Sequence, residues 1–185
     1  MFTVPSNFVG SFKLGDNIAY NCHVLCTLYR LRVEGDAQTK RHLQKPITII
    51  NVSIIDAVLY DFYSRVRTHT REGVANVAAA VLAEWRGRTI DRLERYITQA
   101  RKHDLFGQPD QFYEDLHTLR KLRNRVHIQN EKKDFEPDDH QAFTEARMLL
   151  SEKAVERVLT HMATHHARVH DYVADFQLPW ERHFQ

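Results

Sequence analysis

Residues 116–127 of the chain read LHTLRKLRNRVH and decide its fold class, because their pattern is that of an amphipathic helix. Apolar residues recur at every third or fourth position: Leu116, Leu119, Leu122 and Val126. This spacing predicts one buried face on the C-terminal half of a helix. Since successive helical residues are rotated by roughly 100°, Arg120, Arg123 and His127 are expected together on the rim of that face.

The rim residues form the first candidate functional site. Two guanidinium groups beside an imidazole destabilise a core, because like charges repel and each buried charge needs a partner. The same groups suit a bound phosphate, which guanidinium N–H donors contact in pairs. The sequence therefore predicts an anion-binding site at Arg120, Arg123 and His127.

The composition predicts one folded domain over residues 1–185 without a large charge excess. Hydrophobic residues make up 43% of the chain, enough for a core, and the 6 glycines and 5 prolines are too few for a sandwich or barrel with many tight turns. The 26 basic and 24 acidic residues give a formal net charge of +2. That balance excludes indiscriminate binding to nucleic-acid duplexes through overall charge, so any nucleic-acid contact is expected to be local.

The cysteines and the apolar segments indicate a soluble, cytoplasmic protein. Cys22 and Cys26 lie four residues apart on a predicted helix, a poor geometry for a disulfide, so both are expected to be reduced. The first five residues carry no charged leader followed by an apolar run. The most apolar segment, residues 47–62, is interrupted by polar residues, so no membrane association is expected.

Periodicity and capping signals predict an all-α bundle of about five or six helices. The expected helices cover residues 16–34, 46–69, 72–86, 91–103 and 110–128, followed by a long helix from Pro137 to about residue 165. Residues 1–14 are expected to form a loose N-terminal arm and residues 176–185 a C-terminal tail. No segment shows the alternating pattern of a strand.

The second predicted helix is the most apolar, with one stripe of aliphatic and aromatic residues: Ile47, Ile50, Ile54, Val58, Phe62 and Val66. A helix this apolar either lies at the centre of the fold or faces both a core and a partner subunit. Asp56 lies on another face of this helix. Two interpretations of Asp56 stay open: a solvated surface carboxylate, or an acid that orients the side chains of the candidate site.

The chain resembles the HEPN superfamily at this candidate site. Members of that family are small helical bundles with an arginine, often followed by asparagine, and a histidine after about four to six intervening residues near the end of a helix. Six residues separate Arg120 from His127 and fit this interval. The Arg123-Asn124 dipeptide matches the usual start of the motif, but it lies closer to His127 than the motif requires. Which arginine corresponds to the family's arginine stays open.

The resemblance implies a metal-independent endoribonuclease that needs no cofactor and cleaves single-stranded RNA. In this reaction the RNA 2′-hydroxyl attacks the neighbouring phosphodiester, leaving a 2′,3′-cyclic phosphate and a 5′-hydroxyl. The resemblance makes His127 the general acid or base, Arg120 or Arg123 the phosphate ligand, and Asn124 a group that orients the histidine or the phosphate.

The resemblance also implies a symmetric homodimer with a composite cleft. It further implies a role in toxin–antitoxin or phage-defence systems, with an antitoxin, often a nucleotidyltransferase-like protein, as partner. Two alternatives stay open. One is a non-catalytic HEPN-type module that binds RNA, nucleotide or a protein partner. The other is an ordinary helix whose arginines and histidine pair with acids such as Asp56 or Glu114.

Four histidines near the C-terminus are the candidate metal ligands. His161 and His165 are spaced four residues apart, as are His166 and His170, so each pair can share a helix face. The segment lacks the Glu-x-x-His pattern of metal-binding bundles. The sequence therefore favours solvated or interface histidines over a metal site.

Overall fold

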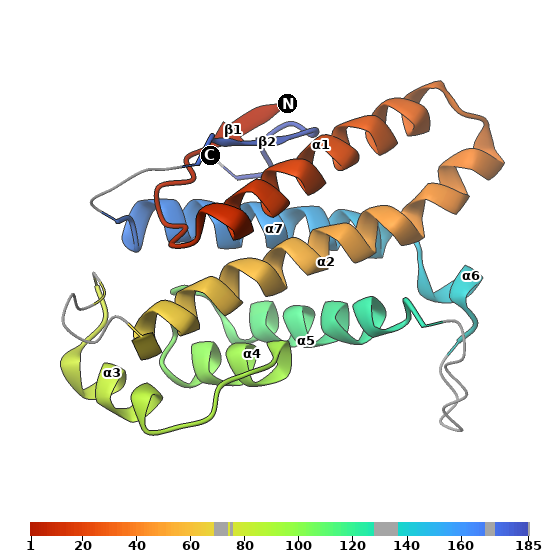
Figure 1. Ribbon diagram of the computed structural model, residues 1–185. Helices are drawn as coiled ribbons and strands as arrows, with labels where there is room; N and C mark the ends of the chain where they lie inside the picture. Colours follow the sequence, from red (N-terminus) through yellow and green to blue (C-terminus); the bar gives the residue numbers. More distant parts are fainter. Residues whose placement is uncertain (69–73, 75, 128–136, 169–172, 185) are drawn as a thin grey trace.

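The 32-residue helix α2 (Ala37–Thr68) is the central element, and the longer helices pack along it. Figure 1 shows α1 (Phe12–Glu34) and α7 (Glu145–His165) along one side of α2, and α4 (Leu93–Lys102) and α5 (Asp110–Asn124) along the other. The shorter elements are β1 (Phe2–Val4), α3 (Ala79–Arg86), α6 (Asp139–Ala142) and β2 (Phe176–Leu178). This computed structural model describes all residues except 69–73, 75, 128–136, 169–172 and 185. The predicted all-α bundle is confirmed.

The core is built around the apolar stripe of α2. Five of the six stripe residues are buried: Ile47, Ile54, Val58, Phe62 and Val66. Ile50, at the edge of the stripe, is half-buried against the core. Within the described chain, α2 is the one helix long and apolar enough to cross a membrane, and 61% of its most apolar window is buried inside the bundle.

Helix α2 begins at Ala37 rather than at Pro46. The backbone N–H of Thr39 donates to Asp36 Oδ1 at 2.7 Å, which caps the helix. Residues 37–45, expected to form a polar connection, are instead the first turns of α2. Pro46 therefore lies inside the helix. The prediction was wrong because polar helix formers before a proline resemble a loop that ends at a helix start.

Helix α1 starts at Phe12, four residues before the predicted cap at Asp16. The hydroxyl of Ser11 accepts a hydrogen bond from the Leu14 N–H at 3.4 Å and serves as the cap. Both cysteines of this helix are free, as predicted. Burial raises the pKa of the Cys22 thiol to about 12, so it is an apolar core group at neutral pH.

The long helix predicted from Pro137 is split in two. Helix α6 ends at Ala142, and the buried ring of Phe143 follows it. The hydroxyl of Thr144 then accepts a hydrogen bond from the Arg147 N–H at 3.3 Å and caps α7. A cap in the middle of a helical pattern was missed because the apolar periodicity continues on both sides of it.

The two ends of the chain meet in a two-stranded antiparallel sheet, and Figure 1 shows the termini close together. The register of β1 against β2 pairs the following residues: Phe2↔Leu178, Thr3↔Gln177 and Val4↔Phe176. The loose arm expected for residues 1–14, and the expectation of no strand, were wrong. Strands of three residues are too short to show a two-residue period, and their partners lie at opposite ends of the chain.

Candidate functional site

Helix α5 carries the predicted site residues and is held in the core by its leucines. Leu116, Leu119 and Leu122 are 2%, 0% and 4% exposed, so the predicted buried face is confirmed at these three positions. These side chains fix the rotation of α5 about its own axis. The polar residues between them are consequently directed toward the neighbouring helices or solvent.

Helix α5 ends at Asn124, earlier than the predicted residue 128. The Arg125 N–H donates to the Leu122 carbonyl at 3.0 Å and the Val126 N–H to the Arg123 carbonyl at 3.2 Å. These three-residue spacings tighten the last turn and rotate the chain away from the leucine face. Val126 is therefore 51% exposed instead of buried. His127 is exposed and lies beyond the helix instead of on its rim.

Arg123 forms the closest ion pair of the candidate site. Its Nη2 donates to Asp56 Oδ2 of α2 at 2.5 Å, and the two side chains are 36% and 20% exposed. Burial raises the pKa of the Asp56 carboxyl, and the positive charge of Arg123 opposes that rise. Asp56 is thus a partly buried, ion-paired acid and not a solvated carboxylate, and this pair fits both an acid that orients Arg123 and an ordinary helix whose arginines pair with acids.

Arg120 is directed toward a different helix. Its Nη1 lies 3.6 Å from Glu94 Oε2 of α4, and its Nε is buried without a hydrogen-bond partner among the described residues. Burial, and next the charge of Arg120, lower the pKa of His117. In the described part of the chain, no side-chain hydrogen bond or ion pair joins Arg120, Arg123, Asn124 and His127 to one another. The predicted rim therefore separates into an α4-facing and an α2-facing arginine.

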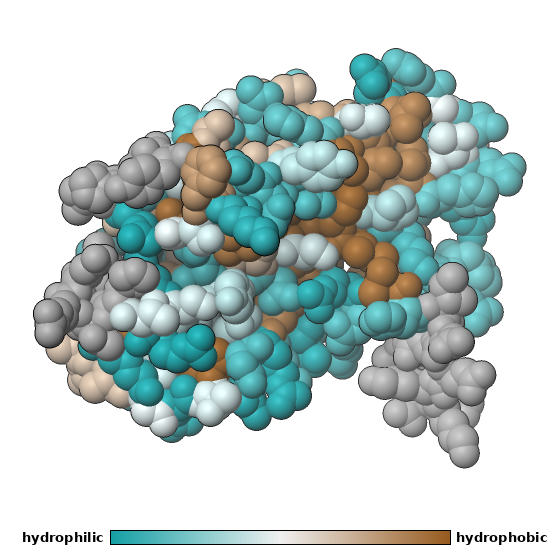
Figure 2. All heavy atoms as spheres, in the orientation of Figure 1, coloured by the Kyte–Doolittle hydropathy of each residue, from teal (hydrophilic) through white to brown (hydrophobic). Residues whose placement is uncertain are grey.

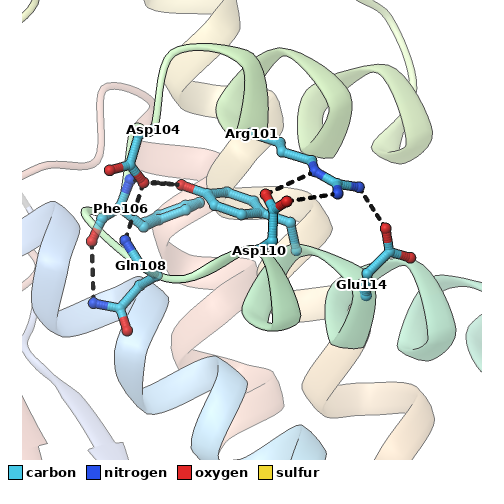
Figure 3. Close-up of polar contacts among 7 residues, drawn as sticks. Arg101, Asp104, Phe106, Gln108, Asp110 and Glu114 are labelled. Carbon is cyan, nitrogen blue, oxygen red and sulfur yellow. Dashed lines mark hydrogen bonds and ion pairs between the residues drawn. The ribbon is translucent and has the colours of Figure 1, made fainter.

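Glu114, the other acid considered for this cluster, pairs elsewhere. Figure 3 shows the Arg101 guanidinium between Asp110 and Glu114, on the N-terminal part of α5. Arg101 Nε and Nη2 donate to the two carboxylate oxygens of Asp110, both at 3.1 Å. This bidentate pair joins α4 to the start of α5. The acids that contact the candidate arginines are Asp56 and Glu94, not Glu114.

Arg125 is a site residue that the sequence pattern missed. Its Nε donates to Asp139 Oδ1 of α6 at 3.0 Å and its Nη2 to the Pro137 carbonyl at 2.5 Å. The second carboxylate oxygen of Asp139 contacts Lys45 Nζ of α2 at 2.5 Å. The Asp139 carboxylate of α6 thus bridges Arg125, which follows α5, and Lys45 of α2. In the sequence, the only sign of this residue was its position next to the motif. Asp139 is distant in sequence and comes close to Arg125 only when the chain folds.

A basic cavity adjoins this end of α5. It has a volume of about 770 Å³ and lies between the first turns of α2 and the region of α6. Its cationic or titratable lining residues are Arg41, His42, Lys45 and His140. Asp139 is the one acidic residue in that lining, and it is shared by Lys45 and Arg125. The cavity consequently has a positive balance of charge beside the segment that leads to His127.

The histidines proposed as metal ligands are placed differently from one another. The rings of His161 and His165 lie 4.4 Å apart, and those of His161 and His166 5.4 Å apart. His166 is 2% exposed and packs against Phe62, so the expectation of a solvated or interface residue was wrong for it. No group of three His, Cys, Asp or Glu suited to a metal ion occurs among the described residues. His170 lies outside them.

Comparisons with protein-family models, with curated proteins and with solved structures find no match to this chain.

Proposed function

We propose that the chain is a HEPN-type, metal-independent endoribonuclease for single-stranded RNA. One observation carries the proposal. Arg123 is held by Asp56 at 2.5 Å, while Asn124 at the end of α5 and His127 three residues beyond it are exposed. An anchored guanidinium beside an exposed amide and an exposed imidazole supplies the three group types that the reaction needs.

The chemistry requires a proton acceptor and a group that binds the phosphate. His127 accepts the proton of the 2′-hydroxyl, or donates one to the leaving 5′-oxygen, because imidazole titrates near neutral pH. Arg123 uses one Nη for Asp56 and has further N–H donors for the scissile phosphate. Arg120 faces α4 and is assigned to helix packing. The proposal therefore selects Arg123 over Arg120 as the family's arginine.

The basic cavity supports a path for the RNA backbone. Phosphates that flank the cleaved bond would contact Arg41, Lys45 and the histidines of this cavity. Positive charge gathered at one cavity is the local nucleic-acid contact expected for a chain whose formal net charge is only +2. Binding is consequently expected to weaken as salt concentration rises, since phosphate contacts release bound counterions.

A homodimer is part of the proposal. Figure 2 shows a band of hydrophobic residues on one face of the molecule, over the middle of α2 and toward α1. Tyr60 of α2 and Val126 after α5 are 52% and 51% exposed. Apolar surface beside a polar site suits a second copy of the chain, which would complete a composite cleft. A toxin or phage-defence role, with an antitoxin or nucleotidyltransferase-like protein as partner, rests on the same resemblance.

A specific observation favours the alternative of a non-catalytic RNA-binding module. His127 has no hydrogen bond or ion pair within the described structure that would orient its ring, and catalytic histidines are commonly oriented by a second group. The basic cavity and the exposed end of α5 would then bind RNA without cleaving it. The two functions differ in turnover, not in RNA affinity.

The test is cleavage of a labelled single-stranded RNA in the presence of EDTA. We expect products with a 2′,3′-cyclic phosphate, and a 10²–10⁴-fold lower rate for His127→Ala and for Arg123→Ala. Lys121→Ala is the matched control, an exposed cation on the same helix. RNA binding without cleavage by the parent protein would favour the binding module. Cleavage by His127→Ala at the parental rate would exclude the assignment of that residue.

The homodimer is tested by analytical ultracentrifugation. Val126→Glu places a charge on exposed apolar surface, so we expect it to yield monomers and to lower the cleavage rate together. Thr118→Glu, an exposed position of α5 on another part of its surface, is the matched control. A parent protein that is monomeric and fully active would contradict the composite cleft.

A further inference from the structure

A second polar cavity lies near the N-terminal end of α5, away from Arg123. Its volume is about 470 Å³, within the range of small-molecule sites. It is bounded by the C-terminal half of α7, by the loop between α4 and α5, and by residues close to the C-terminus. The 15 residues of α5 span roughly 22 Å, so this cavity is separate from the proposed ribonuclease site.

The loop wall of the cavity is held in place by its own hydrogen bonds. Asp104 Oδ1 accepts hydrogen bonds from the Gln108 N–H at 3.0 Å and from the Tyr113 hydroxyl at 2.9 Å, and Figure 3 shows this group. The Tyr113 oxygen in turn accepts the Phe106 N–H at 3.2 Å. Phe106 and Gln108, which line the cavity, are therefore held in place before any ligand binds.

The C-terminal wall is held by two buried carboxylates of α7. Glu156, 2% exposed, accepts the backbone N–H groups of His183 at 3.0 Å and Phe184 at 2.9 Å. Glu152, 5% exposed, accepts hydrogen bonds from the Tyr29 hydroxyl and from His183 Nε2, the latter at 3.1 Å. Burying carboxylates is unfavourable unless such bonds are made, so the tail residues occupy defined positions.

The lining carries an excess of positive charge. The Arg157 guanidinium stacks 3.8 Å from the centre of the Phe184 ring, and the Arg182 guanidinium lies 5.4 Å from that of Phe2. In the described structure, neither arginine takes part in an ion pair. Glu156 also lines the cavity, but its carboxylate is already occupied by two backbone N–H groups. The two guanidiniums outnumber the one carboxylate of the lining, and neither is ion-paired to a described residue, which favours an anionic ligand.

Rings and hydroxyls complete the lining. The imidazoles of His161 and His165 are 4.4 Å apart and tilted by 36°, and Phe106 packs against His161 at 5.2 Å. The Nε2 of His161 is buried and has no hydrogen-bond partner among the described residues. Burial, and next the neighbouring histidines, lower the pKa of His161 to about 4, so its ring is neutral. Planar neutral rings of this kind pack against other planar rings.

We propose that this cavity binds a nucleoside monophosphate, with Arg157 and Arg182 contacting the phosphate and the His161 and His165 rings contacting the base. The two guanidiniums match a doubly charged phosphate, and Thr160 adds a hydroxyl group to the same wall. The ligand is either a free nucleotide or the phosphorylated end of an RNA chain. The site is independent of the proposed ribonuclease activity.

The test is isothermal titration calorimetry on the full chain with AMP, adenosine and inorganic phosphate. We expect micromolar binding of AMP and at least tenfold weaker binding of adenosine and of phosphate. Arg157→Ala and Arg182→Ala should each weaken AMP binding at least tenfold. Arg30→Ala, which removes an exposed arginine of α1, is the control of equal charge change and should bind AMP like the parent.

A short RNA with a 3′-phosphate identifies the source of the ligand. It is titrated into the His127→Ala chain, so that cleavage does not alter the result. Tighter binding of this RNA than of AMP assigns the site to RNA ends if adding Arg157→Ala weakens it at least tenfold, because RNA held at the basic cavity would not respond to that change. Tighter binding of AMP assigns the site to free nucleotides. Equal binding of phosphate and AMP, or unchanged AMP binding by Arg157→Ala and Arg182→Ala, would overturn the proposal.

Discussion

The Arg123 guanidinium joins two helices and is also the proposed phosphate ligand. One of its nitrogens contacts Asp56, and 36% of its side chain stays exposed to solvent or substrate. Arg120, three residues earlier, makes a longer contact of 3.6 Å to a Glu94 side chain that is 52% exposed. Two arginines on one helix therefore differ in how firmly they are anchored.

The difference in anchoring predicts different coupling energies. We expect a double-mutant cycle with Asp56→Asn and Arg123→Gln to give a coupling of about 1 kcal/mol in the free energy of unfolding, because the pair is close and partly buried. The matched cycle with Glu94→Gln and Arg120→Gln should give less than about 0.5 kcal/mol. Urea denaturation measures both. Equal couplings would contradict the special position of Arg123.

His161 predicts a pH dependence of stability. Its pKa is lowered from 6.5 to about 4, so between these values the unfolded chain binds more protons than the folded chain. Stability from this group is fully present above pH 6.5 and is lost as the pH falls toward 4. After discounting for partial exposure, we expect the free energy of unfolding to fall by about 1 kcal/mol more in the parent than in His161→Gln. The control is His23→Gln, at an exposed position of α1. Its free energy of unfolding, measured by urea denaturation at each pH, should change with pH as that of the parent does.

At the level of elements, repeated apolar positions were predictable and helix ends were not. Leu116, Leu119 and Leu122 are buried as their spacing predicts, since a helical period is a local property. Val126 continues the same period but is exposed, because the helix ends two residues earlier at a turn without glycine or proline. The candidate site depends on that end. The sequence therefore predicted the helix but not the separation of Arg120 from His127.

The contacts of the site are long-range and were less predictable still. Asp56 stayed ambiguous in the sequence because its partner is on a different helix, brought close by the packing of α5 against α2. Arg125 and Asp139 are joined across a segment whose course no periodic pattern defines. Pairings of this kind depend on tertiary packing, which the spacing of residues within one helix does not contain.

Pro46 makes a prediction about α2. A proline inside a helix leaves the carbonyl of His42 without its intrahelical N–H donor and crowds the preceding turn. We expect Pro46→Ala to raise the free energy of unfolding by about 1–3 kcal/mol and to raise Tm. Gln38→Ala, an exposed position of the same helix, should change it by less than about 0.5 kcal/mol. A loss of stability in Pro46→Ala would show that the packing of α2 requires the proline.

At the scale of the whole molecule, the two ends of the chain pair with each other and pack against the helices. β2 pairs with β1 and packs on α1, and Trp180 continues the same layer against Tyr29 of α1 with ring centres 5.5 Å apart. Trp180 is only 7% exposed, and the carboxylates of Glu152 and Glu156 hold the residues that follow it. Trp180 is thus part of the core of the bundle, and His183 and Phe184 are held against α7 by Glu156.

This closure predicts that the C-terminal residues unfold together with the helices. Removing a buried tryptophan side chain costs about 3–5 kcal/mol, so Trp180→Ala should lower the free energy of unfolding by about that amount in a single cooperative urea transition. Gln177→Ala, an exposed position of β2, should stay within about 0.5 kcal/mol of the parent. If the tail were only attached to a finished bundle, Trp180→Ala would release it to proteases without moving the transition of the helices. Circular dichroism at the helical minimum, combined with limited proteolysis, separates these outcomes, because only a tail that belongs to the core couples its loss to the melting of α1, α2 and α7.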